Sequence, residues 1–179
     1  ITYLYPDDFN ISYRSEVFAI LADVSLKREY RRAHIPGATA IHKMKELELF
    51  ADTLDREIPI YIYCDGESRS LTVAEYLRDQ GFQTIVLVGH SQGSTMAVYY
   101  LSRQPQPVEG FVAVGMSGGI AGGPMDTLAQ LPALAVPTLD LYGGEDLPEV
   151  LDSADERAAQ ARNAGGDYTQ QVVAGADHF

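Results

Sequence analysis

The sequence is poor in cysteine and in basic side chains, and it contains no long apolar run. Its single cysteine, Cys64, excludes an internal disulfide and any metal site built from several cysteines. No stretch approaches the roughly 18–20 apolar residues that a membrane-spanning helix needs. Only 13 Lys and Arg stand against 25 Asp and Glu, and the net charge of −12 argues against nucleic acids and anionic membranes as partners. We expect a cytoplasmic protein that acts on a small molecule and needs neither a metal nor an organic cofactor.

Short apolar segments alternate along the chain with segments of helical periodicity. Strands are expected at residues 20–24, 39–41, 58–64, 84–89, 110–116, 138–142 and 168–173. Apolar positions three to four residues apart predict helices at 71–80, 94–103 and 153–164. The alternation predicts one α/β domain over residues 1–179, a doubly wound and mainly parallel sheet with helices on both faces. Ligands of such sheets gather beyond the carboxyl ends of the strands.

A short polar loop, Cys64-Asp65-Gly66-Glu67-Ser68-Arg69-Ser70, stands between an expected strand and an expected helix. Loop amides, the helix N-terminus and the charge of Arg69 would each stabilise a thiolate at Cys64. Taken alone, the loop also fits a buried structural cysteine, which is the commoner case.

Five landmarks in residues 15–89 together resemble the rhodanese family. They are Leu21-Ala22-Asp23-Val24, Glu29-Tyr30, His34-Ile35-Pro36-Gly37-Ala38, the cysteine loop and Gly81-Phe82. The resemblance implies a sulfurtransferase in which Cys64 carries a persulfide, with Gly66, Ser68 and Arg69 binding the anion. Phosphatase relatives of this fold place Arg six positions after the cysteine, where this chain has Ser70, so sulfur is favoured over phosphate. The chain departs from the family at Ser25, which usually is Arg, and in the acidic Asp65 and Glu67 beside the anion site.

A second motif, Gly89-His90-Ser91-Gln92-Gly93, matches G-x-S-x-G between an expected strand and an expected helix. The glycines permit the tight turn that lifts Ser91 above the sheet, and the Gln92 N–H is placed to donate to an oxyanion. The motif predicts a nucleophile elbow, with a plain turn as the alternative.

Residues 85–179 resemble the C-terminal half of the α/β-hydrolase family. The resemblance is carried by the elbow, by the strand and loop at 137–146, and by the loop Gly175-Ala176-Asp177-His178. It implies Ser91 as nucleophile, His178 as general base and Asp146 as the acid that orients the imidazole, with Asp140 and Glu145 as rival acids. The family's earlier loop, which supplies the second oxyanion donor, has no counterpart in residues 1–89.

The strand at 84–89 belongs to both patterns, so we expect a rhodanese-like half, 1–89, and a hydrolase-like half, 90–179, to share one sheet. Cys64 and Ser91 would then lie at the same edge, within roughly 5–12 Å of each other. The missing linker favours a chimera of two α/β folds. The leading hypothesis is a serine esterase or acyl hydrolase, weakened by its missing oxyanion loop. The alternatives are a sulfurtransferase using Cys64 and a folded scaffold without efficient catalysis.

Overall fold

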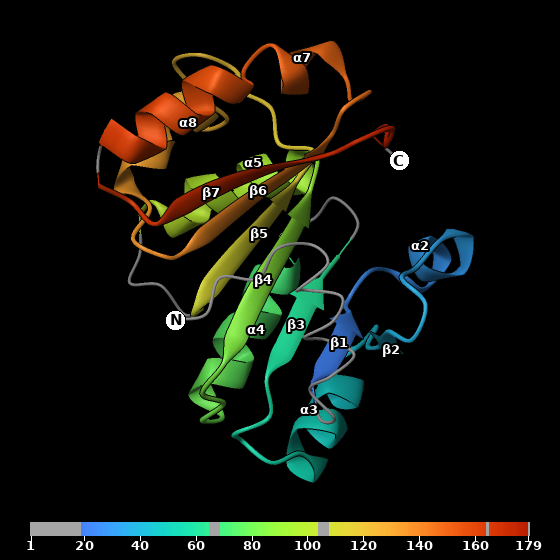
Figure 1. Cartoon of the computed structure of the whole chain (residues 1–179). Coiled ribbons are helices and arrows are strands. Elements are labelled where there is room, and N and C mark those ends of the chain that lie inside the picture. Colours follow the sequence, from blue (N-terminus) through green and yellow to red (C-terminus); the bar gives the residue numbers. More distant parts are fainter. Residues whose placement is uncertain (1–18, 65–68, 104–107, 164, 179) are drawn as a thin grey trace.

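The computed structural model describes residues 19–64, 69–103, 108–163 and 165–178 (Figure 1). Seven strands form one sheet in the order β2-β1-β3-β4-β5-β6-β7, and every neighbouring pair is parallel. The α/β fold and its parallel sheet are confirmed. The strands are β1 (Ile20–Asp23), β2 (Thr39–Ala40), β3 (Ile60–Tyr63), β4 (Ile85–His90), β5 (Gly110–Val114), β6 (Thr138–Gly143) and β7 (Tyr168–Val173).

Seven α-helices and one 3₁₀ turn, η1 (Leu131–Ala133), connect these strands in the described part of the chain. Three of the helices, α4 (Arg69–Asp79), α5 (Gln92–Leu101) and α8 (Ala154–Asn163), lie within two residues of where the apolar spacing predicts them. The remaining four were not expected from the sequence: α2 (Lys27–Arg32), α3 (Met44–Thr53), α6 (Thr127–Gln130) and α7 (Pro148–Leu151). None of the helices in the described ranges is long and apolar enough to cross a membrane.

The main core lies on the face of the sheet that α3, α4 and α5 cover. Alternate strand residues such as Ile60, Ile62, Ile85 and Leu87 point into it, as the two-residue period of a strand requires. A smaller apolar cluster, Leu21, Ala38 and Tyr61, is packed separately from this core. Among the described residues, the larger apolar cluster therefore lies on one face of the sheet.

The parallel register brings the ends of the central strands to one edge. Tyr63 at the end of β3 pairs with Val88 of β4. Cys64, the next residue, therefore lies beside the last residues of β4, the strand that leads into Ser91. Strands β6 and β7 run in the same direction, and Asp146 and His178 follow their carboxyl ends. Both candidate nucleophiles thus share an edge, as expected from the sequence.

Candidate active site

Ser91 sits on a strained turn between β4 and α5. Its backbone has φ 55° and ψ −122°, and it is the one non-glycine residue in the described part of the chain with a positive φ. Such a conformation costs about 1–3 kcal/mol and persists only where neighbouring structure enforces it. Here the Ser91 N–H donates to Val114 O (2.8 Å) and the Ser94 N–H donates to Ser91 O (3.0 Å). Ser91 thus lies on a tight turn between a strand and a helix, which is the structural context expected around G-x-S-x-G.

The two glycines of the motif do different things. A Cβ at Gly89 would lie 2.8 Å from the Cα of Ser94, so the strand can approach the helix only without a side chain there. A Cβ at Gly93 would meet no heavy atom within 4 Å. Packing therefore requires Gly89, whereas Gly93 leaves open space beside the Ser91 turn.

Ser91, His178 and Asp146 are joined by a continuous chain of hydrogen bonds. The Ser91 hydroxyl donates to His178 Nε2 (2.8 Å), and His178 Nδ1–H donates to Asp146 Oδ1 (2.5 Å). The carboxylate can only accept, so it places the ring proton on Nδ1 and leaves Nε2 to receive a proton. His178 and Asp146 are only 6% and 7% exposed. The structure thus brings together three residues that the sequence separates by up to 87 positions.

Neither rival acid takes the place of Asp146, because Asp140 is paired with Arg157 and Glu145 is exposed. Asp140 is fully buried in β6, where Arg157 of α8 donates to its Oδ2 (2.8 Å). The backbone N–H of Glu145 donates to Ala176 O (2.9 Å), which ties the acid loop to the histidine loop. Asp146 is the carboxylate that faces the imidazole.

Backbone donors hold the Asp146 carboxylate in its ionised form. Burial works to raise the pKa of Asp146, but the Gly143 N–H, the His178 ring and the Leu147 N–H outweigh it and lower this pKa below its usual value. An ionised Asp146 accepts the His178 Nδ1–H bond and thereby orients the imidazole, and it would stabilise an imidazolium if His178 took up a proton.

The histidine loop is held by close backbone approaches and by a second histidine. A Cβ at Gly143 would lie 2.2 Å from Ala176 O, and one at Gly115 would lie 2.9 Å from the His178 ring. His90 Nε2 donates to His178 O (2.8 Å), with ring centroids 4.9 Å apart. No local pattern around Gly115 or His90 predicts these contacts with His178. His90 does stand inside the serine motif, but its contact with His178 depends on the folded sheet.

The oxyanion region is described in part. Gln92 begins α5, and within the described ranges no acceptor is found for its N–H. The N-terminus of this ten-residue helix also favours negative charge there. Gly66 and Ser68, expected to bind an anion through the cysteine loop, lie outside the described residues.

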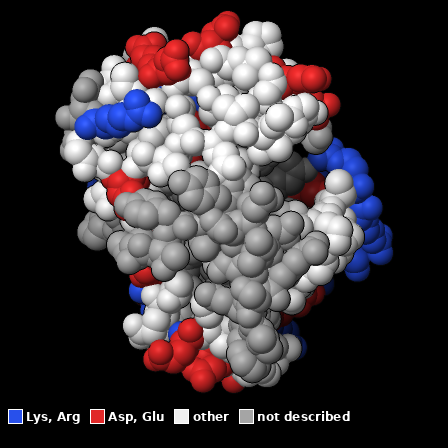
Figure 2. Space-filling view, viewed as in Figure 1, with Lys and Arg blue, Asp and Glu red and all other residues white. Residues whose placement is uncertain are grey.

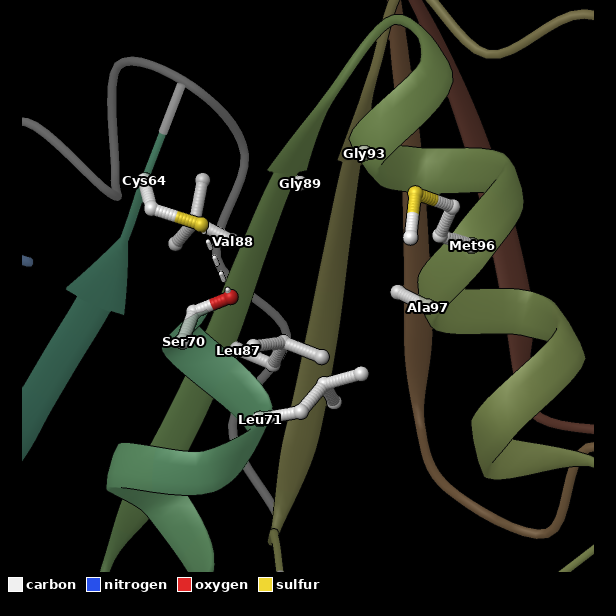
Figure 3. Close-up of a pocket in the computed structure, with 9 residues that line it drawn as sticks. All are labelled: Cys64, Ser70, Leu71, Leu87, Val88, Gly89, Gly93, Met96 and Ala97. Atoms are coloured by element: carbon white, nitrogen blue, oxygen red, sulfur yellow. Dashed lines mark hydrogen bonds between the residues drawn. The ribbon is translucent and has the colours of Figure 1, made fainter. Parts of the chain in front are cut away.

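Cys64 is buried at the end of β3, and its thiol donates to Ser70 Oγ (3.4 Å). A cavity of about 10 Å³, room for about one water molecule, lies beside it. Figure 3 shows its lining, which includes Gly89 and Gly93 on either side of the Ser91 turn and Met96 from α5. Cys64 and the glycines that flank Ser91 therefore line the same small cavity.

Arg69, expected to add charge beside the thiol, lines a different cavity. That cavity has a volume of about 210 Å³ and includes His42 and Lys43 from the segment before α3. Ser70 and Leu71 line the small cavity at Cys64, so the first turn of α4 contributes to both.

Comparison with known proteins assigns the chain to families. It belongs to the rhodanese-like domain family, which matches residues 12–102, and to a family of proteins of unknown function, DUF3530, which matches residues 71–177. It is similar to the thiosulfate sulfurtransferase GlpE of Coxiella burnetii, with 34% identity over 67 residues. That alignment covers 37% of this chain and 61% of the relative, so the chain spans less than two thirds of the relative's length.

Solved structures show a second likeness, to α/β-hydrolase folds. A candidate dienelactone hydrolase from Klebsiella pneumoniae has a TM-score of 0.55 at 16% identity, covering 90% of this chain and 75% of that one. A candidate YdeN-like hydrolase from Pectobacterium atrosepticum has a TM-score of 0.52 at 18% identity, covering 96% and 84%. At these identities the likeness concerns the fold. The chain thus combines a rhodanese-like domain with a hydrolase-like arrangement of strands.

Proposed function

We propose that the protein is a serine hydrolase acting on small esters or other small acyl compounds. The observation that carries the proposal is the hydrogen-bond chain Ser91–His178–Asp146, with distances of 2.8 and 2.5 Å. The strained φ of Ser91 and the family order of serine, acid and histidine support it.

The reaction follows from the direction of these hydrogen bonds. Ser91 Oγ attacks the ester carbonyl carbon while its proton passes to His178 Nε2. The imidazolium then donates this proton to the leaving alkoxide as the carbon–oxygen bond breaks, which leaves an acyl-Ser91. Water, deprotonated by His178, hydrolyses that acyl group, and the carboxylic acid leaves as Ser91 regains its proton.

We expect the proposed enzyme to be weak, because within the described ranges the Gln92 N–H is the one donor in the family's oxyanion position. Removing a single oxyanion donor costs about 10²–10³ in kcat where it has been measured. A hydrolase without the loop that normally brings the second donor should therefore turn over slowly.

Hydrolysis of p-nitrophenyl acetate tests the proposal, together with covalent labelling by a fluorophosphonate. Wild-type protein should hydrolyse the ester and gain one phosphonyl adduct on Ser91, seen by peptide mass spectrometry. Ser91→Ala should lose both, whereas Ser102→Ala, at the far end of α5, should keep both. A wild-type rate equal to that of Ser91→Ala would refute the proposal.

We propose sulfur transfer at Cys64 as the alternative function. The rhodanese-like match spans Cys64, and a cavity beside its thiol can hold about one small atom. Cyanide-dependent consumption of thiosulfate, lost in Cys64→Ser and kept in Ser91→Ala, would support this activity. A folded protein inactive in both assays would leave only the scaffold hypothesis.

A further inference from the structure

A fully buried ion pair joins the strand β6 to the helix α8. Asp140 lies in β6, between β5 and β7, and Arg157 lies in α8, and both side chains are 0% exposed. Arg157 Nε donates to Asp140 Oδ2 (2.8 Å). The Tyr168 hydroxyl (2.5 Å) and the Gln170 side-chain amide (3.0 Å), both from β7, donate to the same oxygen. The Asp140 carboxylate is thus fixed to the sheet, and it holds the guanidinium in place.

The inward position of Arg157 contrasts with the surface above it. Glu149 of α7 and both Asp155 and Glu156 of α8 are exposed. Figure 2 shows mainly Asp and Glu over these two helices, at the top of the view. Arg157 therefore pairs with a carboxylate buried in β6, although exposed carboxylates lie on its own helix.

The stability of the fold does not by itself account for this ion pair. Two charges that are removed from water lose their hydration, and their mutual attraction often does no more than compensate for that loss. Replacing such a pair by neutral side chains of similar volume is often neutral or stabilising. The other contacts of the guanidinium indicate what the pair holds in place.

The guanidinium reaches from β6 to α7. Arg157 Nη1 donates to Val150 O (2.8 Å) and to Ser153 Oγ (2.6 Å). The Ser153 hydroxyl in turn donates to Glu149 O (2.6 Å). Val150 is itself buried, with 1% of its surface exposed. The single turn of α7 is therefore tied to the sheet through the Arg157 side chain.

The α7 turn also holds the acid of the candidate triad. Leu147 directly precedes this turn, and its backbone oxygen accepts the N–H groups of Val150 (2.9 Å) and Leu151 (3.1 Å). The Leu147 N–H donates to Asp146 Oδ1 (2.8 Å), and the same oxygen accepts His178 Nδ1–H (2.5 Å). A shift of α7 would therefore move the oxygen that orients the imidazole.

We propose that Arg157, held by Asp140, is a positioning residue that fixes α7 through Val150 O and thereby places Asp146 against His178. Arg157 is fully buried, so it acts through α7 and not on the substrate. This role rests on the proposed hydrolase function, because it concerns the same triad.

A double variant, Asp140→Asn with Arg157→Met, removes both buried charges and keeps an oxygen that can accept from Tyr168. It should fold, as thermal denaturation will check, because neither charge is left unpaired. We expect kcat for p-nitrophenyl acetate to fall at least about tenfold, because a triad displaced by a fraction of an ångström reacts more slowly. KM should stay within about twofold, because no contact with the substrate is lost. Wild-type kcat in the folded double variant overturns the proposal.

The matched control is Arg162→Met. Arg162 lies near the end of the same helix, α8, but it is exposed. Its replacement removes one positive charge from α8 without touching the buried pair, so both kcat and KM should stay within about twofold of wild type. A loss in this control as large as in the double variant would assign the effect to net charge and overturn the positioning role.

Proton NMR of the His178 Nδ1–H measures the same geometry without any ester. A proton in a short hydrogen bond to a carboxylate resonates far downfield. This signal should be present in wild type and Arg162→Met, absent in His178→Gln, which identifies it, and lost or shifted upfield in the double variant. If wild type hydrolyses no ester but the signal behaves in this way, the hydrolase function fails and the positioning role stands. A wild-type signal in the double variant, or no signal in wild type, overturns the positioning role.

Ser153→Ala covers the case in which the double variant does not fold. It keeps the ion pair and removes the hydroxyl that links Arg157 to Glu149 O. The loss of one anchor should lower kcat about two- to fourfold and shift the His178 signal upfield. An unchanged signal in Ser153→Ala would then overturn the proposal.

Discussion

At the scale of single residues, His90 links the serine turn to the histidine loop. Its Nε2–H donates to the backbone oxygen of His178, whose ring accepts from Ser91. His90 does not touch the reacting atoms in this geometry, so we assign it a positioning role. A base displaced by about 1 Å can lose 10²-fold in rate, which makes such a support consequential.

Replacing His90 should therefore change kcat rather than KM. We expect His90→Phe, which keeps a ring but loses the donor, to lower kcat for p-nitrophenyl acetate about tenfold while KM stays within twofold. His90→Gln retains an N–H donor and should recover part of that loss. Steady-state kinetics will measure kcat and KM of both variants, and thermal denaturation will check that both are folded. Equal losses in both variants would assign His90 a purely structural role.

A second residue-scale prediction concerns Asp146 and pH. Its pKa in the folded protein lies below the ordinary value, so its ionised form stabilises the fold above that ordinary value. This stability is lost as the pH falls from about 4 through the lowered pKa. Urea denaturation between pH 7 and pH 2.5 should show wild type more stable than Asp146→Asn at neutral pH, with the gap narrowing below about pH 4.

The exposed carboxylate Asp152 provides the control for this experiment. Asp152→Asn should differ from wild type by a small amount in the free energy of unfolding over the same range. A gap between wild type and Asp146→Asn that stays constant in acid would contradict the depressed pKa.

At the scale of elements, the strand–turn–helix around Ser91 depends on one of its two glycines. Gly89→Ala would push a Cβ to 2.8 Å from the backbone of Ser94, and overpacking of this kind costs about 1–3 kcal/mol. Gly93→Ala meets no atom within 4 Å and replaces a glycine in α5, so it should stabilise by about 0.5–1 kcal/mol. Chemical denaturation of the two variants measures this difference. A Gly89→Ala protein as stable as wild type would contradict the close approach.

The helices that could be predicted from the sequence differ from the others in the spacing of their apolar residues. Helices α4 and α5 bury several positions at helical spacing, and their periodicity is readable. Helix α3 buries only Leu47 and Ala51, and its run Glu46-Leu47-Glu48-Leu49 alternates with the period of a strand. Packing against the sheet decides in favour of the helix there, and that packing is invisible in the local sequence.

The same distinction applies to the candidate site, where residues in local motifs could be predicted and contacts between distant elements could not. Ser91, Asp146 and His178 could be proposed because each stands at the end of a readable strand in a family motif. The contact between His90 and His178 joins residues 88 positions apart, and Arg69 lines a cavity with residues from three other elements. Such contacts follow from the register of the whole sheet, so no local sequence pattern predicts them.

At the scale of the molecule, β4 joins the two halves without a break. It pairs with β3 of the rhodanese-like part and with β5 of the hydrolase-like part, in the same seven-stranded sheet. We therefore predict that the chain unfolds as one cooperative unit, although its sequence changes character within this strand. Stability lost in one half should be lost equally in the other.

The variant Tyr168→Phe tests this prediction from the far edge of the sheet. Its hydroxyl donates to the buried Asp140 (2.5 Å), and losing that bond to a charged acceptor should cost about 1.5–3 kcal/mol. In urea, reaction of Cys64 with a thiol reagent reports on the first half, and tyrosine circular dichroism reports on the chain as a whole. In the cooperative case both midpoints fall together by the same amount. If the Cys64 midpoint stays at its wild-type value while the other falls, the two halves unfold independently and the shared strand does not couple them.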